Sequence, residues 1–273
     1  MKELLLRKLA AFRSREDKLN FAREFLQELI LQIIDRKGYF KNLAFVGGTA
    51  LRTIYDLPRF SEDLDFSLVN PKGFTFKGML ATLKRELELS GFMVEEAVGK
   101  EKTVQSEFIK FKGLPYQLGL SEHKNEKLFV KLEIDTLPPP GFITEIVMIN
   151  KNFLFKVRCY EPPSLFAGKL HAVLFRKYAK GRDYYDLLWF LTRKIPVNYE
   201  LLTNAAAQTE KKALPMNREA LKHLLAAKID RTDFAHIRDD VQPFLGKKEE
   251  IEYFRKEYFL AAIEKYFSQN VTL

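Results

Sequence analysis

The segment between residues 43 and 66 constrains the fold of this chain more than any other part of the sequence. Leu43-Ala44-Phe45-Val46 is a short apolar run typical of a buried strand, and Gly47 and Gly48 follow it directly. Two glycines at this point allow a tight turn whose backbone N–H groups can approach an anion closely. We therefore expect a strand, a turn suited to phosphate, and then a helix from Thr49 to Asp56.

Two aspartates occupy the next apolar stretch. Asp63 and Asp65 are separated by one residue, next to the run Leu64 to Leu68. Because side chains alternate along a strand, both carboxylates point to one face while Leu64 and Phe66 point to the other. Two like charges so close together repel each other unless a cation lies between them. A hard divalent metal, most naturally Mg²⁺, is predicted there.

A third carboxylate is expected from a later strand. In the run Phe129 to Asp135, apolar residues alternate with Lys131, Glu133 and Asp135, so these three side chains share the opposite face. Either Glu133 or Asp135 would complete a metal site with the two aspartates, and a solvent-facing charged edge is the alternative interpretation. Carboxylates held this close are what a reaction assisted by two metal ions requires.

Two blocks of sequence together carry a family resemblance. Gly47-Gly48-Thr49-Ala50-Leu51-Arg52 with Ser61-Glu62-Asp63-Leu64-Asp65-Phe66 resembles the first motif of the nucleotidyltransferase superfamily, in the form found in the AbiEii/AbiGii toxin family. Lys169-Leu170-His171-Ala172, Arg176 and Gly181-Arg182-Asp183-Tyr184-Tyr185-Asp186-Leu187 resemble that family's distal lysine and Arg-Asp motifs. The resemblance covers roughly residues 40 to 190.

The resemblance implies an activity. It implies a magnesium-dependent enzyme that transfers a nucleoside monophosphate from a nucleoside triphosphate to an acceptor, with two Mg²⁺ ions. It also implies an RNA acceptor such as tRNA and the role of toxin in a toxin–antitoxin or phage-defence pair, with a separately encoded antitoxin. A small-molecule acceptor is the enzymatic alternative. A catalytically silent nucleotide-binding module is disfavoured, because such a module has no need for three converging carboxylates.

The resemblance also implies roles for individual residues. Asp63, Asp65 and a third carboxylate would hold the metal, and the family's pattern of a carboxylate after an apolar-Lys-apolar run matches Glu133 better than Asp135. Lys169 and Asp183 would join them in catalysis, the lysine touching the triphosphate or base and the aspartate orienting the lysine. The expected nucleotide-binding residues are Gly47, Gly48, Thr49, Arg52, Lys169 and Arg182.

Several of these residues have structural alternatives. Thr49 is equally a helix N-cap. Lys169, Asp183 and Asp186 are equally explained by an ion-pair network that includes Arg176. Arg52 and Arg59 flank the first motif, and a phosphate contact by either competes with an ordinary surface position.

Composition narrows the class of protein and its partners. Nearly half of the 273 residues are apolar, so a sizeable core is expected. A single cysteine excludes an intrachain disulfide, and no long apolar span is visible, so we expect a cytoplasmic protein without membrane contact. The net charge of +9 favours polyanionic partners.

The pattern of elements predicts an α+β fold in two domains. A long amphipathic helix from Asp17 to Asp35 precedes alternating strands and helices that form a mixed, nucleotidyltransferase-like sheet. Pro162-Pro163 marks the boundary, after which the pattern is helical almost throughout. We expect a catalytic domain at 1–160 and a helical domain at 161–273 that supplies the far side of the cleft. The last helix is expected from Lys248 to Phe267.

Overall fold

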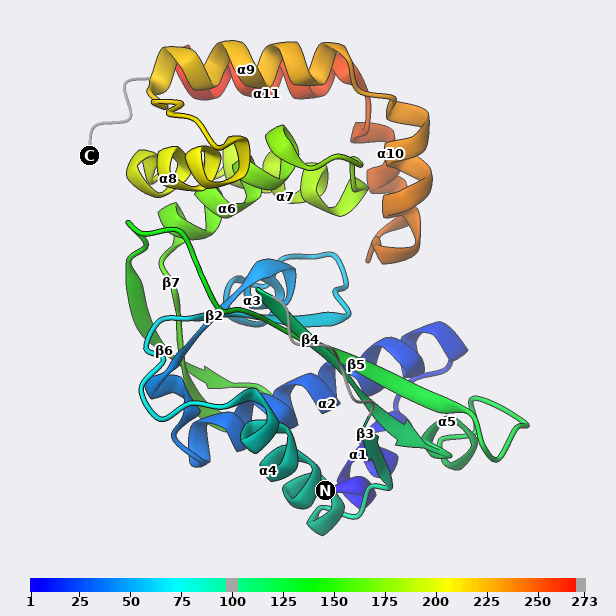
Figure 1. The fold of residues 1–273 in the computed structure, drawn as a ribbon. Helices are drawn as coiled ribbons and strands as arrows, with labels where there is room; N and C mark the ends of the chain where they lie inside the picture. The colour runs from blue at the N-terminus through cyan, green and yellow to red at the C-terminus, as the bar shows by residue number, and fades with distance from the viewer. Residues whose placement is uncertain (97–102, 269–273) are drawn as a thin grey trace. The chain divides into compact units, whose positions relative to one another are not determined.

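The computed structural model describes residues 1–96 and 103–268, which form two compact units (Figure 1). Unit 1 comprises residues 1–54, 62–138 and 146–159, and unit 2 comprises residues 55–61, 139–145 and 160–273. The division therefore differs from the single boundary predicted near Pro162. Two short segments, 55–61 and 139–145, leave the first part of the chain to pack with the helical unit, and their sequences carry no signal of this.

The strands of the described residues form a seven-stranded mixed sheet in the order β3-β4-β5-β2-β1-β7-β6. Their bounds are β1 Leu43–Val46, β2 Asp63–Leu68, β3 Val94–Glu96, β4 Val104–Lys112, β5 Lys127–Asp135, β6 Thr144–Asn150 and β7 Leu154–Tyr160. β2 runs antiparallel to β1 and parallel to β5, and β1 runs parallel to β7. The predicted α+β class with a mixed sheet is confirmed.

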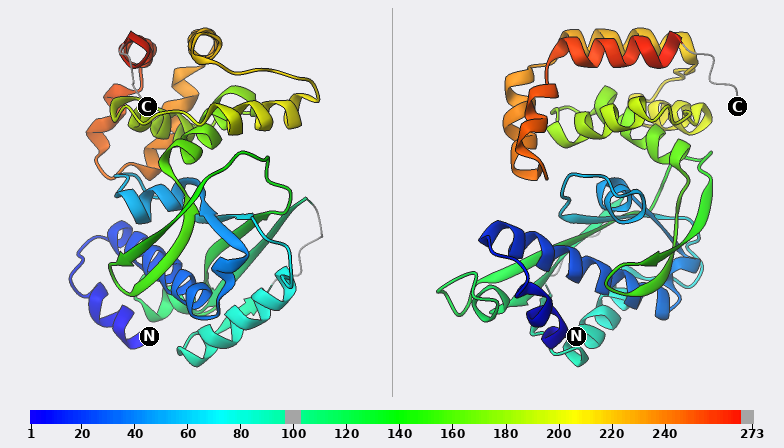
Figure 2. Two further views of the ribbon diagram at one scale, coloured as in Figure 1. Left: turned by 90° about the vertical axis from the view of Figure 1, so that its left-hand side faces the viewer. Right: turned by 180° about the vertical axis from the view of Figure 1, so that it is seen from behind.

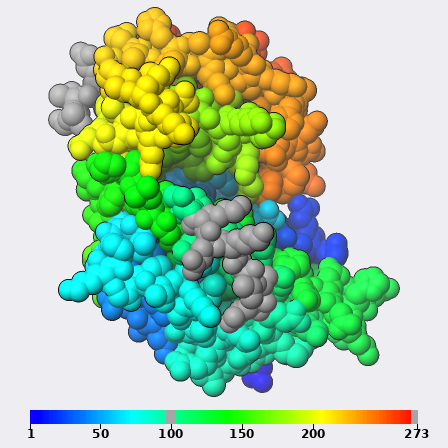
Figure 3. All heavy atoms as spheres, viewed as in Figure 1, coloured from blue at the N-terminus to red at the C-terminus, as the bar shows by residue number. Residues whose placement is uncertain are grey.

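Helices cover the sheet of unit 1 (Figures 1 and 2). They are α1 Lys2–Leu9, α2 Arg15–Arg36, α3 Gly47–Tyr55, α4 Phe76–Leu89 and α5 Leu114–Gln117. Ser14 caps α2 by accepting a hydrogen bond from the Asp17 N–H, and Gly38 follows the helix with a φ of 73°. In the space-filling view, the green segment around α5 projects from the surface of unit 1 (Figure 3). Helix α1, α5 and strand β6 were not predicted.

The long helix α2 supplies much of the core of unit 1. Ten of its side chains are buried, among them Phe25, Leu26, Ile30 and Ile34. They pack with Leu64 and the other inward-facing residues of the sheet. Burial of apolar surface at roughly 25 cal/mol per Å² is the main force that holds this layer on the sheet. The opposite face of β2 and β5 is left to the charged residues.

Unit 2 consists mostly of helices. They are α6 Pro162–Phe175, α7 Gly181–Thr192, α8 Tyr199–Glu210, α9 Arg218–Asp230, α10 Phe234–Val241 and α11 Lys256–Ser268, with 3₁₀ turns at η2 Gln242–Phe244 and η3 Lys248–Tyr253. Helices α9 and α11 lie side by side (Figure 2). The helix predicted from Lys248 to Phe267 is wrong in its first part, because Lys248–Tyr253 is a 3₁₀ segment that Phe254 ends.

Aromatic side chains fill the interior of unit 2. Phe166 of α6 stacks on Phe190 of α7 with ring centroids 4.5 Å apart. Tyr184 contacts Phe259 edge to face at 5.8 Å, which ties α7 to α11. Such pairs add to the free energy of area burial by about 0.5–1.5 kcal/mol each. Among the described residues, no helix combines the length and the hydropathy needed to span a bilayer.

Candidate active site

The charged face of the sheet in unit 1 brings the predicted carboxylates together. Asp65 of β2 and Glu133 of β5 are paired in register on neighbouring parallel strands, and Asp63 is paired with Lys131. Leu64 and Phe66 are buried on the other face of β2. The alternation expected from the sequence therefore holds, and all four charged side chains emerge on one face.

Gly47 lies directly against Asp65. Its φ is +80°, and a β-carbon built on it would lie 2.1 Å from Asp65 Oδ2. Only a residue without a side chain fits at this point, where the first turn of α3 meets β2. The N–H groups of a helix's first turn have no acceptor within the helix, so the start of α3 next to Asp65 offers anion-binding donors.

Thr49 joins the turn to the second strand. Its hydroxyl donates a hydrogen bond to the carbonyl oxygen of Asp63, and the residue is 1% exposed. Helix α3 begins at Gly47, so Thr49 lies inside the first turn and is not the N-cap. The hydroxyl hydrogen is used within the fold, which leaves the main-chain N–H as the group by which Thr49 would bind nucleotide.

Lys131 supplies the counter-charge on this face. Its Nζ lies 2.8 Å from Glu133 Oε1. Burial acts to lower the pKa of Lys131, but the carboxylates of Glu133, Asp63 and Asp65 outweigh it and raise the pKa. The ammonium thus stands among the same three carboxylates that were predicted to surround Mg²⁺.

The donor set suits a hard cation, but the closed cage of carboxylates is not formed. Carboxylate oxygens are the ligands that Mg²⁺ prefers, and register places Glu133 beside Asp65. Among residues 1–96 and 103–268, no three His, Cys, Asp or Glu side chains are gathered closely enough to hold a metal ion. Glu133 is paired with Lys131 at 2.8 Å instead.

Asp135 lies further along the same face. It is in register with Ser67, and its Oδ1 accepts a hydrogen bond of 3.0 Å from the Leu137 N–H. Burial raises the pKa of this carboxyl. Of the two predicted third ligands, Glu133 is therefore the one that lies next to Asp65.

The distal motif forms a buried ion-pair network within unit 2. Lys169 Nζ lies 3.1 Å from Asp183 Oδ1 and 2.8 Å from Asp186 Oδ2. Arg176 pairs with Asp183, and Arg59 pairs with Asp186 through two hydrogen bonds of 2.6 Å. Burial raises the pKa of Asp183, but Lys169 and Arg176 outweigh it and hold the pKa below its usual value. The two carboxylates thus hold the Lys169 ammonium between them.

Three arginines near the predicted motifs have intramolecular partners. Arg59 has a side chain that is 1% exposed and paired with Asp186, so it is not the ordinary surface residue that was the alternative to a phosphate contact. Arg52 Nε donates to Glu24 Oε1 at 2.6 Å within unit 1. The guanidinium of Arg182 lies over the ring of Phe244, 4.2 Å from its centroid. Arg52 and Arg182 remain predicted nucleotide ligands, each held by one of these contacts.

Sequence reasoning gave no function to Lys131. The signal was present, because Lys131 alternates with Glu133 and Asp135 on the charged face. Its importance became visible only with the pairing of β2 and β5, which sets it beside Asp63. Strand pairing between distant segments is not encoded in the local pattern of either strand.

Comparisons with known proteins show the family and the fold of this chain. The model of the family described as "Nucleotidyl transferase AbiEii toxin, Type IV TA system" matches residues 29–265. The structure of JHP933 from Helicobacter pylori superposes with a TM-score of 0.56 at 18% identity, covering 91% of this chain and 92% of that one. A "putative nucleotidyltransferase from H. pylori" superposes with a TM-score of 0.54 at 17% identity, covering 89% and 94%.

A search of curated proteins gave no match. The two solved structures show a shared fold at low identity, whereas the family model covers most of the chain. The protein is therefore a nucleotidyltransferase, and it belongs to the AbiEii family of type IV toxin–antitoxin systems.

Proposed function

We propose that the protein transfers a nucleoside monophosphate from a nucleoside triphosphate to an RNA acceptor such as tRNA, with Mg²⁺, as the toxin of a toxin–antitoxin pair. The observation that carries the proposal is the placement of Asp65 between Gly47 and Glu133 on the charged face of the sheet. The net charge of +9 supports a polyanionic acceptor. Family membership supports a separate antitoxin as partner.

The reaction divides into parts that named residues can perform. An acceptor hydroxyl loses its proton to solvent as its oxygen bonds to the α-phosphorus. The bond from that phosphorus to the oxygen that bridges to the β-phosphate breaks, and pyrophosphate leaves. Asp63, Asp65 and Glu133 would hold Mg²⁺, and two such ions stabilise the attacking and leaving oxygens of such a displacement. The N–H groups of Gly47 and Gly48 would bind the triphosphate at the start of α3.

The distal network belongs to the same proposal. Lys169 would contact the triphosphate, and Asp183 would orient it through the 3.1 Å ion pair. Because Lys169 also pairs with Asp186, its ammonium is held in one place before the nucleotide arrives. Such preorganised positive charge stabilises developing phosphate charge without reorganisation during the reaction.

Labelling of acceptors tests the proposal. The protein is incubated with Mg²⁺, each of the four α-³²P-labelled triphosphates and total RNA, beside Asp65→Asn and Lys169→Ala. We expect label in an RNA band with the wild type and loss of at least about 10²-fold in each variant. Glu252→Ala, an exposed residue of unit 2, serves as the control that keeps activity. Label on small molecules alone, or none on any acceptor, would overturn the RNA assignment.

A further inference from the structure

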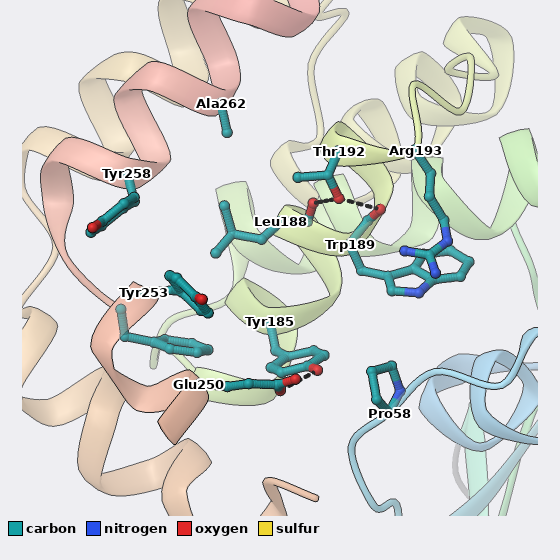
Figure 4. A pocket seen from close by; sticks show the side chains of 11 residues that line it. Pro58, Tyr185, Leu188, Trp189, Thr192, Arg193, Glu250, Tyr253, Tyr258 and Ala262 are labelled. Atoms are coloured by element: carbon teal, nitrogen blue, oxygen red, sulfur yellow. Dashed lines mark hydrogen bonds between the residues drawn. The ribbon is translucent and has the colours of Figure 1, made fainter. Parts of the chain in front are cut away.

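A cavity of about 390 Å³ lies within unit 2 (Figure 4), and no residue of the ion-pair network lines it. Its walls come from the segment 55–61, α7, η3 and α11. The volume falls within the roughly 300–1,000 Å³ that small-ligand sites occupy. Most of the wall is apolar and aromatic, with contributions from Tyr185, Trp189, Tyr253, Phe254 and Tyr258.

Flat aromatic rings border this cavity on several sides. Tyr253 and Tyr258 lie edge to face with centroids 5.8 Å apart, and both side chains are about half exposed. Tyr185 stacks near Phe254 at 6.1 Å. Exposed rings arranged around a hollow offer faces on which a planar ligand can stack.

One buried donor in the wall has no hydrogen bond. Trp189 is 7% exposed, and within the described part of the chain its indole Nε1 finds no acceptor. In Figure 4 the nitrogen-bearing edge of the indole is turned toward the side of the cavity where Pro58 lies. An unpaired buried N–H has already lost its hydration, so a ligand acceptor that reaches it adds a hydrogen bond at little further desolvation.

One acceptor stands in the same wall. Glu250 Oε2 accepts a hydrogen bond of 2.7 Å from the Tyr185 hydroxyl. A carboxylate accepts several hydrogen bonds, so Glu250 keeps capacity for a donor on a ligand. The wall therefore provides an N–H donor at Trp189 and a carboxylate acceptor at Glu250, with aromatic faces between them.

Positive charge stands at the rim. The guanidinium of Arg193 lies 4.5 Å from the centroid of the Trp189 rings, and both Arg193 and the next residue, Lys194, are exposed. Exposed cations beside a stacking site attract the phosphates of a nucleic-acid strand. The cavity thus offers aromatic faces for stacking, a hydrogen-bond donor and acceptor in its wall, and positive charge at its rim. A planar ligand that carries both donors and acceptors on its edge and is attached to phosphate matches all three features.

We propose that this cavity binds an unpaired nucleobase of single-stranded RNA, stacked on the tyrosines and hydrogen-bonded to Trp189 and Glu250. The identification of this RNA as the acceptor of the nucleotide rests on the proposed function, whereas the binding of a base in the cavity does not. Every base can stack on an aromatic side chain, so we expect the site to prefer single-stranded RNA but to show little preference for its sequence. A free nucleotide carries the same base chemistry, and the experiment separates the two sources.

Trp189 is the only tryptophan of the chain, so its fluorescence reports occupancy of the cavity directly. The full-length protein without Mg²⁺ is titrated with four nucleosides, the four triphosphates, a single-stranded oligoribonucleotide and its duplex. We expect saturable quenching by the single strand at concentrations at least about tenfold lower than by any nucleoside or triphosphate, and weaker quenching by the duplex. Tighter quenching by triphosphates than by the oligonucleotide would reassign the site to free nucleotide and overturn the RNA proposal.

Variants separate the cavity from the rest of the surface. Tyr253→Leu is expected to weaken oligonucleotide binding at least about fivefold by anisotropy of a labelled strand. Trp189→Phe, which keeps a ring and removes the N–H, is expected to weaken it as well. The matched control is Tyr178→Leu, an exposed tyrosine of unit 2 that does not line the cavity. Equal loss in Tyr253→Leu and Tyr178→Leu would overturn the proposal.

These experiments distinguish a failure of the cavity proposal from a failure of the proposed function. Asp65→Asn removes a proposed metal ligand of unit 1 and is expected to leave fluorescence quenching unchanged. Quenching without label transfer in the wild type would uphold the cavity and refute the proposed function. Label transfer to RNA without any quenching would uphold the proposed function and refute the binding of RNA in the cavity. Quenching by an aromatic peptide but by no RNA would assign the cavity to a protein partner instead.

Discussion

Arg59 and Asp186 form a bidentate ion pair in the interior of unit 2. Arg59 Nε and Nη2 each lie 2.6 Å from one carboxylate oxygen, and the side chains are 1% and 0% exposed. Lys169 Nζ shares the same carboxylate at 2.8 Å. One aspartate thus faces two buried cations, and its removal leaves the Arg59 guanidinium in the interior without its carboxylate.

We predict that Asp186→Ala lowers the free energy of unfolding by about 3–5 kcal/mol, because it breaks a buried pair from one side. Guanidinium denaturation followed by the fluorescence of Trp189 measures this in unit 2. The control is Glu252→Ala, whose partner Arg255 is exposed, and which is expected to change the free energy by less than about 1 kcal/mol. Equal effects of the two variants would contradict the prediction.

A second prediction concerns pH and Asp183. Burial acts to raise the pKa of this carboxyl, but Lys169 and Arg176 outweigh it and lower the pKa from 3.8. The unfolded chain therefore binds the proton more tightly, and the stabilisation is present above pH 3.8 and lost as pH falls through the folded pKa. We expect the free-energy difference between wild type and Asp183→Asn to be constant at neutral pH and to shrink in acid.

Denaturation curves at a series of pH values measure that difference. Subtracting the variant from the wild type removes the contribution of the other carboxyls, which titrate in both proteins. A difference that stays constant down to about pH 2 would show that Asp183 contributes no linked stability. A difference that grows in acid would have the wrong sign.

Local patterns in the sequence were sufficient to predict which side chains lie on the charged face of unit 1. The alternation of Leu64 and Phe66 with Asp63 and Asp65 fixes which side chains share a face, whatever the strand pairs with. The α+β class followed from the same kind of periodicity. Register was not predictable, because the pairing of Asp65 with Glu133 joins two strands far apart in the chain.

The missed features depend on contacts between distant segments. The segment 55–61 belongs to unit 2 because Arg59 is bound by Asp186, a residue that the chain reaches only in α7. The 3₁₀ segment Lys248–Tyr253 has the composition of a helix, yet Tyr185 binds Glu250 and the chain turns before α11. The cavity beside Trp189 draws on four separate segments, so no single stretch of sequence indicates it.

A third prediction concerns the contact between Gly47 and Asp65. Gly47→Ala places a β-carbon 2.1 Å from Asp65 Oδ2 at a φ of +80°, so the turn or the carboxylate must move. We expect the rate of label transfer to fall at least about 10²-fold, because a shift of about 1 Å in the position of a reacting or metal-binding group can slow a reaction by that factor. The labelling assay with Mg²⁺ and RNA measures it.

Gly38→Ala is the matched control for that change. Gly38 has a φ of +73°, and a β-carbon there would meet nothing within 4 Å. Both variants carry the backbone strain of a side chain at positive φ, about 1–3 kcal/mol, but only Gly47→Ala adds the clash. Similar activity in the two variants would show that the contact with Asp65 has no part in the reaction.

A fourth prediction concerns Lys131 and the binding of Mg²⁺. The ammonium lies 2.8 Å from Glu133 and raises the local positive charge where a cation would bind. Lys131→Met frees Glu133, so we expect the Kd for Mg²⁺ to fall about two- to fivefold, as the loss of a partly exposed ion pair would give. Asp65→Asn is expected to weaken Mg²⁺ binding. Isothermal titration of the protein with MgCl₂ measures both.

The control for this change must remove the same charge elsewhere on the strand. Lys127 of β5 pairs with Glu95, and the two side chains are exposed to a similar degree as Lys131 and Glu133. Lys127→Met therefore alters the net charge equally but leaves Glu133 in its ion pair. If both variants change the Kd for Mg²⁺ alike, the effect comes from net charge and not from the release of Glu133. If Lys131→Met alone tightens binding, the ammonium competes with the metal for Glu133, and the ligand-free enzyme uses Lys131 to neutralise the carboxylates until Mg²⁺ arrives.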